Sequence, residues 1–146
     1  MPIVMRILEK KGPEVLTIGR NASVLDAAVM MNEHKIGALV VLESGRVEGI
    51  VTERDVLQRV VAERKDPAKT TVESVMTREV ACCKPEAKID EARSIMKYKR
   101  IRHLPVVDES RRLVGLISIG DLNAWEIDGQ EMTIQYLHQY LYGEMV

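Results

Sequence analysis

Residues 23–41 read SVLDAAVMMNEHKIGALVV and residues 88–107 read KIDEARSIMKYKRIRHLPVV, so one pattern occurs twice at a shift of 65 positions. The pattern continues in both copies, because RVEGIVTERDVL from Arg46 returns as RLVGLISIGDLN from Arg112 at a shift of 66. A fixed internal period indicates a repeated structural unit. Two copies of one unit therefore account for most of the 146 residues.

Each copy alternates between extended runs and one-sided helices. Ser23, followed by Asp26 three positions later, predicts the start of a helix in the first copy. Apolar and β-branched runs predict strands at residues 15–18, 38–42 and 47–51 in the first copy, and at residues 80–83, 104–107 and 113–117 in the second. A second helix is expected after each third strand. The order β, α, β, β, α predicts an α/β (α+β) fold with helices over a small sheet.

The boundaries of the units follow from composition. The stretches VMRIL from Val4 and VESVM from Val72 precede the two copies and are expected to be lead-in strands. Residues 63–71, ERKDPAKTT, are polar and suit a linker. We predict a first repeat at residues 1–66, a second at 67–128 and a C-terminal helix at 129–146. Apolar residues at i, i+4 spacing in that helix either close the core or contact a second chain.

Composition excludes several classes of protein. The chain is 46% hydrophobic and 29% charged, as in ordinary globular proteins, so we expect it to fold. Its net charge of −1 gives no global attraction to nucleic acid or to anionic membranes. We find neither a signal-peptide pattern nor about 18 consecutive apolar residues, so we expect a cytoplasmic protein without a membrane span.

Cys82 and Cys83 are adjacent and are the only cysteines in the chain. Neighbouring cysteines do not close an ordinary disulfide loop, and they lack the histidine spacing of a zinc site. We interpret them as small apolar residues of a strand, with a redox pair as the alternative.

The segments GIVTERD and GLISIGD, residues 49–55 and 115–121, place a hydroxyl and a carboxylate at the same spacing where a strand turns into a helix. The pairs are Thr52 with Asp55 and Ser118 with Asp121. Such a pair suits the vicinal diol of a ribose, while free amides at the helix start favour a phosphate. The same residues also suit simple helix capping, and the sequence leaves both interpretations open.

Both copies resemble CBS domains, the family named for cystathionine β-synthase. The resemblance rests on SVLDAAVMM, KIGALVVL and GRVEGIVTERDVL in the first copy, and on KIDEARSIM, RIRHLPVVD and RRLVGLISIGDL in the second. It covers roughly residues 4–127 and leaves no room for an enzyme domain. It implies two repeats packed through their sheets, two related clefts between them, and a homodimer. It also implies a regulatory, non-catalytic module that binds an adenosine ligand.

The resemblance implies roles for sixteen residues. The ribose would contact Thr52, Asp55, Ser118 and Asp121. The adenine would contact Thr17, Ile18, Cys82 and Cys83, with Ile36, Ala38 and Pro105 close by. The phosphates would contact Lys35, Arg54, Arg100, Arg102 and His103. Lys97 and Lys99 fit a solvated helix end equally well. The expected ligand is AMP, ADP or ATP, with NAD(H) and S-adenosylmethionine as alternatives, and an unknown regulated protein is the expected partner.

The copies are not equivalent, since Gly37 and Ala38 stand where the second copy has Arg102 and His103. One or both clefts are therefore expected to bind ligand. An adaptor that grips a protein or RNA through KYKRIRH and the C-terminal helix is the main alternative function, although aromatic residues for base stacking are scarce at 3%. Catalysis by paired aspartates, or by Cys83 with His103, is a weaker alternative.

Overall fold

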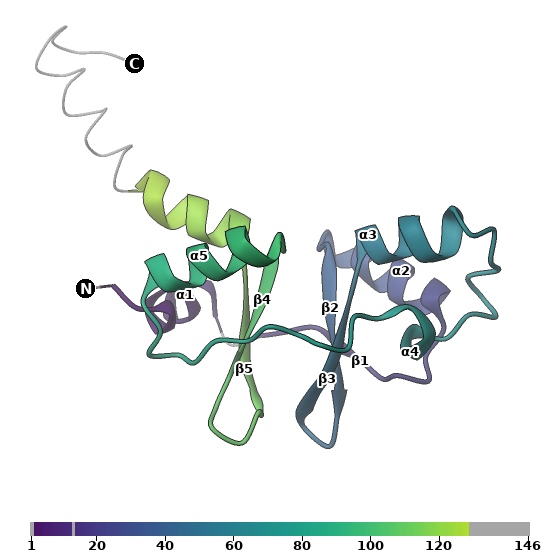
Figure 1. The fold of residues 1–146 in the computed structure, drawn as a ribbon, viewed down its shortest axis with the longest axis horizontal. Coiled ribbons are helices and arrows are strands. Elements are labelled where there is room, and N and C mark those ends of the chain that lie inside the picture. Colours follow the sequence, from purple (N-terminus) through teal and green to yellow (C-terminus); the bar gives the residue numbers. More distant parts are fainter. Residues whose placement is uncertain (1, 13, 129–146) are drawn as a thin grey trace, which may run out of the picture.

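The computed structural model describes residues 2–12 and 14–128 as two similar units that lie side by side (Figure 1). The first unit contains β1 (Thr17–Ile18), α2 (Val24–His34), β2 (Ala38–Glu43), β3 (Arg46–Thr52), α3 (Glu53–Val56) and the π-helix η1 (Leu57–Val61). The second contains α5 (Ile89–Lys99), β4 (His103–Val107), β5 (Leu113–Ser118) and a helix at residues 119–128. Helices α1 (Val4–Lys11) and α4 (Val72–Val75) precede the units.

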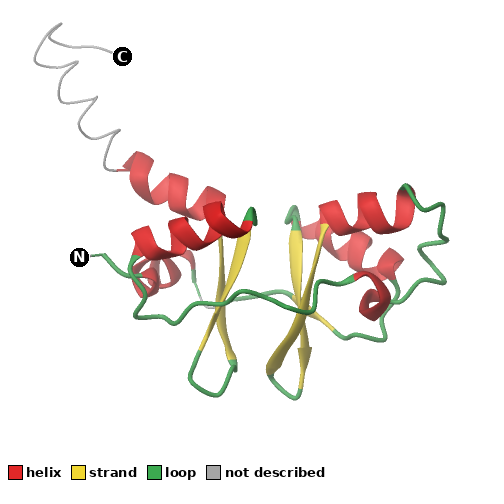
Figure 2. Ribbon diagram, viewed as in Figure 1, coloured by secondary structure: helices red, strands yellow, loops and turns green. Residues whose placement is uncertain are grey.

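Each unit has its own small sheet, coloured yellow in Figure 2. In the first unit β1 pairs in parallel with β2, and β2 pairs antiparallel with β3. In the second unit β4 pairs antiparallel with β5. The predicted α+β fold is confirmed. The strand predicted at residues 80–83 is wrong, because only Cys83 forms a bridge, with Val106, before Pro85 ends the extended run.

Local signals set the ends of the helices that cover the sheets. The Ser23 hydroxyl accepts a hydrogen bond from the Asp26 amide at 3.0 Å, so the predicted N-cap of α2 is confirmed. Helices α2 and α5 both end in the left-handed conformation, at Lys35 with φ 53° and at Arg100 with φ 55°. The chain thus leaves both helices in the same way and enters β2 and β4 in equivalent positions.

The two lead-in segments are helices rather than the expected strands, and each lies on the opposite unit. The amide of Val4, at the start of α1, donates to the Ala87 carbonyl at 2.8 Å. The amide of Val72, at the start of α4, donates to the Ala22 carbonyl at 2.8 Å. Each contact satisfies an amide that a helix start leaves free. The chain therefore crosses between the units after α1 and again after α4.

Each unit has a hydrophobic core that includes the lead-in helix preceding the other unit. One cluster joins α1 to the second unit and consists of Val4, Ile7, Leu8, Cys83, Ile89, Ala92, Met96, Leu104, Val106, Ile117 and Leu122. The other joins α4 to the first unit and consists of Ile18, Val24, Ala27, Met31, Leu39, Val41, Val51, Val60, Val72, Val75 and Met76. The predicted ranges 1–66 and 67–128 stay a prediction, and each core combines segments of both.

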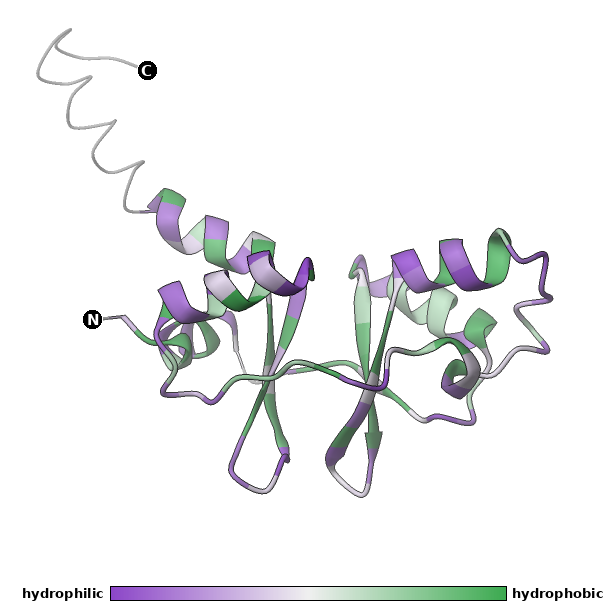
Figure 3. Cartoon of the chain, viewed as in Figure 1, coloured by the Kyte–Doolittle hydropathy of each residue, from purple (hydrophilic) through white to green (hydrophobic). Residues whose placement is uncertain are grey.

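The sheets hold the two units together. Val40, Val47 and Val107 form a third buried cluster between them. At the hairpin tips the Val47 amide donates to the Arg111 carbonyl at 3.3 Å, and the Leu113 amide donates to the Gly45 carbonyl at 3.3 Å. Figure 3 shows hydrophobic residues along these strands and hydrophilic residues at the tips. Packing through the sheets, as the family resemblance implies, is thus observed.

Two expectations concern helices elsewhere. The C-terminal helix predicted at residues 129–146 lies outside the described residues. None of the helices in the described part of the chain has the length and apolar character needed to cross a membrane.

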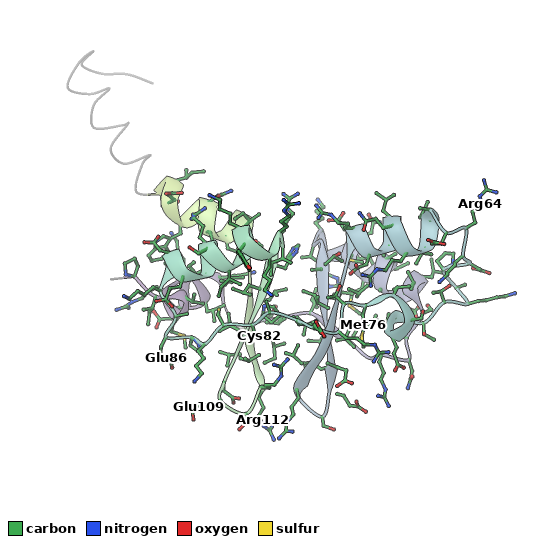
Figure 4. All side chains as sticks on the ribbon, in the orientation of Figure 1. Arg64, Met76, Cys82, Glu86, Glu109 and Arg112 are labelled. Atoms are coloured by element: carbon green, nitrogen blue, oxygen red, sulfur yellow. The ribbon has the colours of Figure 1, made fainter. Side chains whose placement is uncertain are left out.

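Gly49 of β3 is required by the packing of α4. A Cβ atom there would lie 2.6 Å from Met76 Sδ and 2.8 Å from the backbone oxygen of Thr77, and Figure 4 labels Met76 beside β3. Because the backbone cannot move aside cheaply, we expect Gly49→Ala to lower the free energy of unfolding by about 1–3 kcal/mol. Thermal unfolding should show a loss of about 2–4 °C per kcal/mol.

The other glycines provide matched controls. In Gly115→Ala the three atoms nearest to the new methyl group all belong to the Leu8 side chain, which can shift more easily than backbone, so the loss should be smaller. A Cβ atom at Gly19 meets nothing within 4 Å, so Gly19→Ala should cost nothing. Equal unfolding temperatures for all three variants would contradict this account of the packing.

Candidate functional site

A cavity of about 970 Å³ lies between the two units. One wall comes from β3, α3 and the residues before β2. The other comes from the end of α5, the start of β4 and the first residues of the helix at 119–128. The segment that follows α4 crosses the cavity and completes it. The lining residues are Gly37, Ile50, Thr52, Glu53, Arg54, Asp55, Thr77, Arg78, Glu79, Val80, Ala81, Lys99, Arg100, Ile101, Arg102, His103, Arg111, Ser118, Ile119 and Gly120.

The two hydroxyl and carboxylate pairs form the same reciprocal helix cap. In the first unit the Thr52 amide donates to Asp55 Oδ2 at 2.9 Å, and the Asp55 amide donates to Thr52 Oγ1 at 3.2 Å. In the second unit the Ser118 amide donates to Asp121 Oδ2 at 2.8 Å, and the Asp121 amide donates to Ser118 Oγ at 3.1 Å. Capping is therefore observed in both units, and it fixes each carboxylate at the start of a helix.

The two carboxylates differ in their surroundings. Asp55 is 7% exposed, and it is the one charged residue that is buried within residues 2–12 and 14–128. It lines the cavity, and its Oδ1 lies 3.9 Å from Arg59 Nε, beyond hydrogen-bond distance. Asp121 does not line the cavity, and its Oδ2 accepts a hydrogen bond from Lys11 Nζ at 2.8 Å. Asp55 thus lines the cavity, and its Oδ1 can accept a further hydrogen bond.

The cavity lining combines cationic and apolar side chains. Six basic residues line it, namely Arg54, Arg78, Lys99, Arg100, Arg102 and Arg111, against three carboxylates, Glu53, Asp55 and Glu79. This excess attracts anions, and guanidinium groups suit the oxygens of a phosphate. The apolar lining is provided by Ile50, Val80, Ala81, Ile101 and Ile119. The cavity therefore suits a ligand with an apolar part and an anionic part.

The CBS domain family matches residues 8–62 and 72–127, which are the two units with their connections. The chain belongs to the CBS domain family. CBS domain-containing protein YhcV of Bacillus subtilis is 36% identical over 109 residues, which are 75% of this chain and 76% of that protein. The expectation of a tandem pair of CBS repeats is thus confirmed.

Solved structures agree with this CBS pair. A CBS-domain containing protein from Agrobacterium tumefaciens is 38% identical, with a TM-score of 0.79 and coverage of 85% of this chain and 98% of that chain. The CBS domain pair of protein MJ0100, solved in complex with 5′-methylthioadenosine and S-adenosyl-L-methionine, is 28% identical, with a TM-score of 0.79 and coverage of 89% and 98%.

The cavity brings together seven of the sixteen predicted site residues: Thr52, Arg54, Asp55, Arg100, Arg102, His103 and Ser118. Lys35 and Ile36 line a smaller hollow of about 450 Å³, which shares Gly37 and Glu53 with the first. The remaining seven line neither of these two hollows: Thr17, Ile18, Ala38, Cys82, Cys83, Pro105 and Asp121. Their predicted roles in binding stay predictions.

Sequence reasoning missed part of the cavity. The crossing segment at residues 77–81 was not assigned to any site, and Arg111 lies in a turn after β4 that carries no motif. Lys99, left open as a solvated helix end, lines the cavity. No local signal identifies these residues, since their role depends on how the chain crosses between the units of the CBS pair.

The thiols do not suit a reactive site. Burial raises the pKa of the Cys83 thiol to about 12, with a smaller contribution from neighbouring Cys82. Burial also raises the pKa of Cys82, against the lowering effect of Arg111. Few thiolates then form at neutral pH, and the thiolate is the reactive form of cysteine. Within residues 2–12 and 14–128, no group of three or more His, Cys, Asp and Glu side chains is placed to hold a metal ion.

His103 lines the cavity in an environment that disfavours its charged form. Burial lowers its pKa most, and the positive charges of Arg102 and Lys11 lower it further, while Glu53 and Asp121 oppose them. The unfolded chain, with an ordinary histidine pKa of about 6.5, therefore takes up a proton before the folded chain does. Folding stability must then fall as the pH drops below that ordinary value.

We expect the unfolding temperature of His103→Gln to fall less than that of the wild type when the pH is lowered from about 7.5 to about 5.5. Scanning calorimetry at several pH values measures the difference. His34→Gln is the control for loss of a histidine, because His34 lies on the exposed last turn of α2. If His103→Gln follows the wild type across this range, the assigned direction of the pKa shift is wrong.

Proposed function

We propose that this CBS pair is a regulatory module that binds AMP, ADP or ATP in the cavity between its repeats and catalyses no reaction. One observation carries the proposal: Asp55, a buried carboxylate that caps helix α3, lines a cavity that is otherwise rich in basic side chains. A carboxylate accepts hydrogen bonds from the two hydroxyls of a ribose, while the basic groups neutralise phosphates. An adenine nucleotide carries both features.

The lining supports one orientation of the nucleotide. The ribose would lie at Asp55 and Thr52, and the phosphates would extend toward Arg100, Arg102 and His103. The apolar side chains of Ile50, Val80, Ala81, Ile101 and Ile119 would contact the adenine. The adenosine compounds in the MJ0100 structure agree with the adenosine part of the proposal. NAD(H) and S-adenosylmethionine remain competing ligands, and the basic lining favours a ligand with phosphates.

The regulatory step would follow from where the cavity lies. Its walls come from both repeats, so a bound nucleotide favours the arrangement of repeats that it contacts best. A protein partner that recognises one arrangement would then respond to the nucleotide. The cytoplasm, the location expected from the sequence, is the proposed setting for this response.

Thermal unfolding with and without AMP, ADP, ATP, NAD⁺ and S-adenosylmethionine tests this function. A ligand at about 100 times its dissociation constant adds about 2.7 kcal/mol to stability, which corresponds to a rise of about 5–10 °C. We expect Asp55→Ala to weaken binding about 10- to 100-fold, through loss of hydrogen bonds to a charged acceptor.

Asp121→Ala is the matched control, because it removes an equivalent helix cap outside the cavity. It also loses the hydrogen bond from Lys11, so it should lose stability and still keep the shift with nucleotide. If none of the five compounds shifts the unfolding temperature of the wild type, nucleotide binding is excluded and the adaptor function becomes the better one.

We also propose that the module is a homodimer that associates through the helices of its first repeat. Leu57 and Val61 on η1 are each 62% exposed, and Leu25 and Val29 on α2 are 43% and 46% exposed. Exposed large apolar side chains suit a protein interface, and the first repeat carries four of the six in the described residues, the other two being Tyr98 and Ile127. The C-terminal tail, for which a second chain was one predicted contact, lies outside the described residues.

Sedimentation equilibrium should report a dimer for the wild type and a monomer for the double variant Leu57→Glu/Val61→Glu, since burying two carboxylates in an apolar contact is strongly unfavourable. Gln58→Glu adds a charge to the same turn outside the apolar set, and it should remain a dimer. A monomeric wild type would contradict the proposed assembly.

A further inference from the structure

The carboxylate of the second repeat already has a cationic partner from the same chain. Lys11 Nζ donates to Asp121 Oδ2 at 2.8 Å and to the Leu116 carbonyl at 2.8 Å. Lys11 belongs to α1, so this contact joins residues that are 110 positions apart in the chain. The side chains of Lys11 and Asp121 are 37% and 24% exposed, so the pair is partly shielded from water. An ammonium group thus lies at one oxygen of the carboxylate that corresponds to Asp55 in the other repeat.

In the first repeat, the position equivalent to Leu116 is bonded by backbone groups instead of a lysine side chain. Ile50 corresponds to Leu116 at the repeat shift of 66. Ile50 exchanges backbone hydrogen bonds with Thr77, at 3.0 Å and 2.9 Å, because the chain leaves α4 after Val75 and becomes extended. Backbone groups there satisfy the strand edge, and within residues 2–12 and 14–128 the ion-pair partner of Asp55 is Arg59 rather than a lysine.

The different lengths of the lead-in helices cause this contrast. Helix α4 has 4 residues, whereas α1 has 8 and continues to Lys11. The second turn of α1 brings the Lys11 side chain over β5, where its ammonium group bonds the carbonyl of Leu116 in place of a backbone amide. The exchange of lead-in helices therefore delivers a cation to one motif aspartate and leaves the other free of it.

The basic neighbour of Asp55 is engaged elsewhere. Arg59 donates to the carbonyls of Val75 at 2.8 Å and Met76 at 3.3 Å, which hold its guanidinium at the end of α4. Its Nε lies 3.9 Å from Asp55 Oδ1, too far for a hydrogen bond. Both bonds to Asp121, from Lys11 Nζ and from the Ser118 amide, fall on Oδ2, so the two motif aspartates are equal in capping and differ in that only Asp121 accepts a hydrogen bond from a cationic side chain.

We infer that Lys11 is an internal occupant of the second adenosine position, so that the CBS pair binds one nucleotide per chain, at Asp55. The inference rests on the proposed function and deepens it, because it assigns Lys11 as the residue that selects between the two repeats. A nucleotide reaches Asp121 only after the ammonium group leaves, and its ribose hydroxyls compete with a charge-assisted hydrogen bond.

Calorimetric titration of the wild type and of Lys11→Met with ATP, and separately with AMP, tests this inference. Methionine keeps most of the length of the side chain and removes the ammonium group. We expect one nucleotide per wild-type chain and two per Lys11→Met chain, with affinity at the second position raised at least about fivefold, the factor that an exposed ion pair can represent. Adding Asp121→Ala to Lys11→Met should return the count to one.

Lys10→Met is the matched control, because Lys10 lies on the same helix and pairs with Asp128 instead. It should bind one nucleotide, and Lys11→Gln should repeat the Lys11→Met result if the methionine variant unfolds. A count of two in the wild type, or of one in both Lys11 variants, overturns the inference and leaves the proposed function standing. Weaker binding in both variants overturns it too, since Lys11 would then contact phosphate. Absence of binding in every protein overturns both.

Discussion

Helices α1 and α4 each complete the hydrophobic core of the opposite repeat, and this exchange constrains the rest of the structure. Val4, Ile7 and Leu8 belong to the core of the second repeat, and Val72, Val75 and Met76 belong to the core of the first. Neither repeat can bury its apolar face without the segment that precedes the other one. The connection after α4 must therefore cross the space between the sheets, where it becomes part of the cavity.

The crossing explains features that otherwise look unrelated. Gly49 is needed because α4 packs against β3, and Gly115 meets Leu8 of α1 in the equivalent place. Arg78 lines the cavity because it follows α4, and Lys11 reaches Asp121 because α1 is longer than α4. The two repeats thus share one fold but differ in the side chains around their motif aspartates. This difference comes from the lead-in helices more than from the repeats.

The arrangement of the two repeats suits a protein that responds to a ligand. The two sheets share a small cluster, Val40, Val47 and Val107, and two long hydrogen bonds at the hairpin tips. The cavity has walls from both repeats, so a ligand that contacts both favours the arrangement of repeats that it contacts best. Interfaces between domains of one chain commonly allow such movement.

The sequence by itself determined the repeat, the helices α2 and α5, the two strand pairs β2–β3 and β4–β5 and the capping pairs, because these depend on residues that are close along the chain. Ser23 with Asp26 and Thr52 with Asp55 are contacts over three positions, and both were predictable. The predicted lead-in strands were wrong, since a short apolar run such as VESVM has no local feature that separates strand from helix.

Only the tertiary structure decided which predicted residues meet. It brought seven of the sixteen to one cavity and added Arg78 and Arg111. It placed Lys11 on Asp121, a pair separated by 110 positions that no periodicity relates. Such contacts depend on the path of the whole chain between two cores, and that path follows from burying both apolar faces at once.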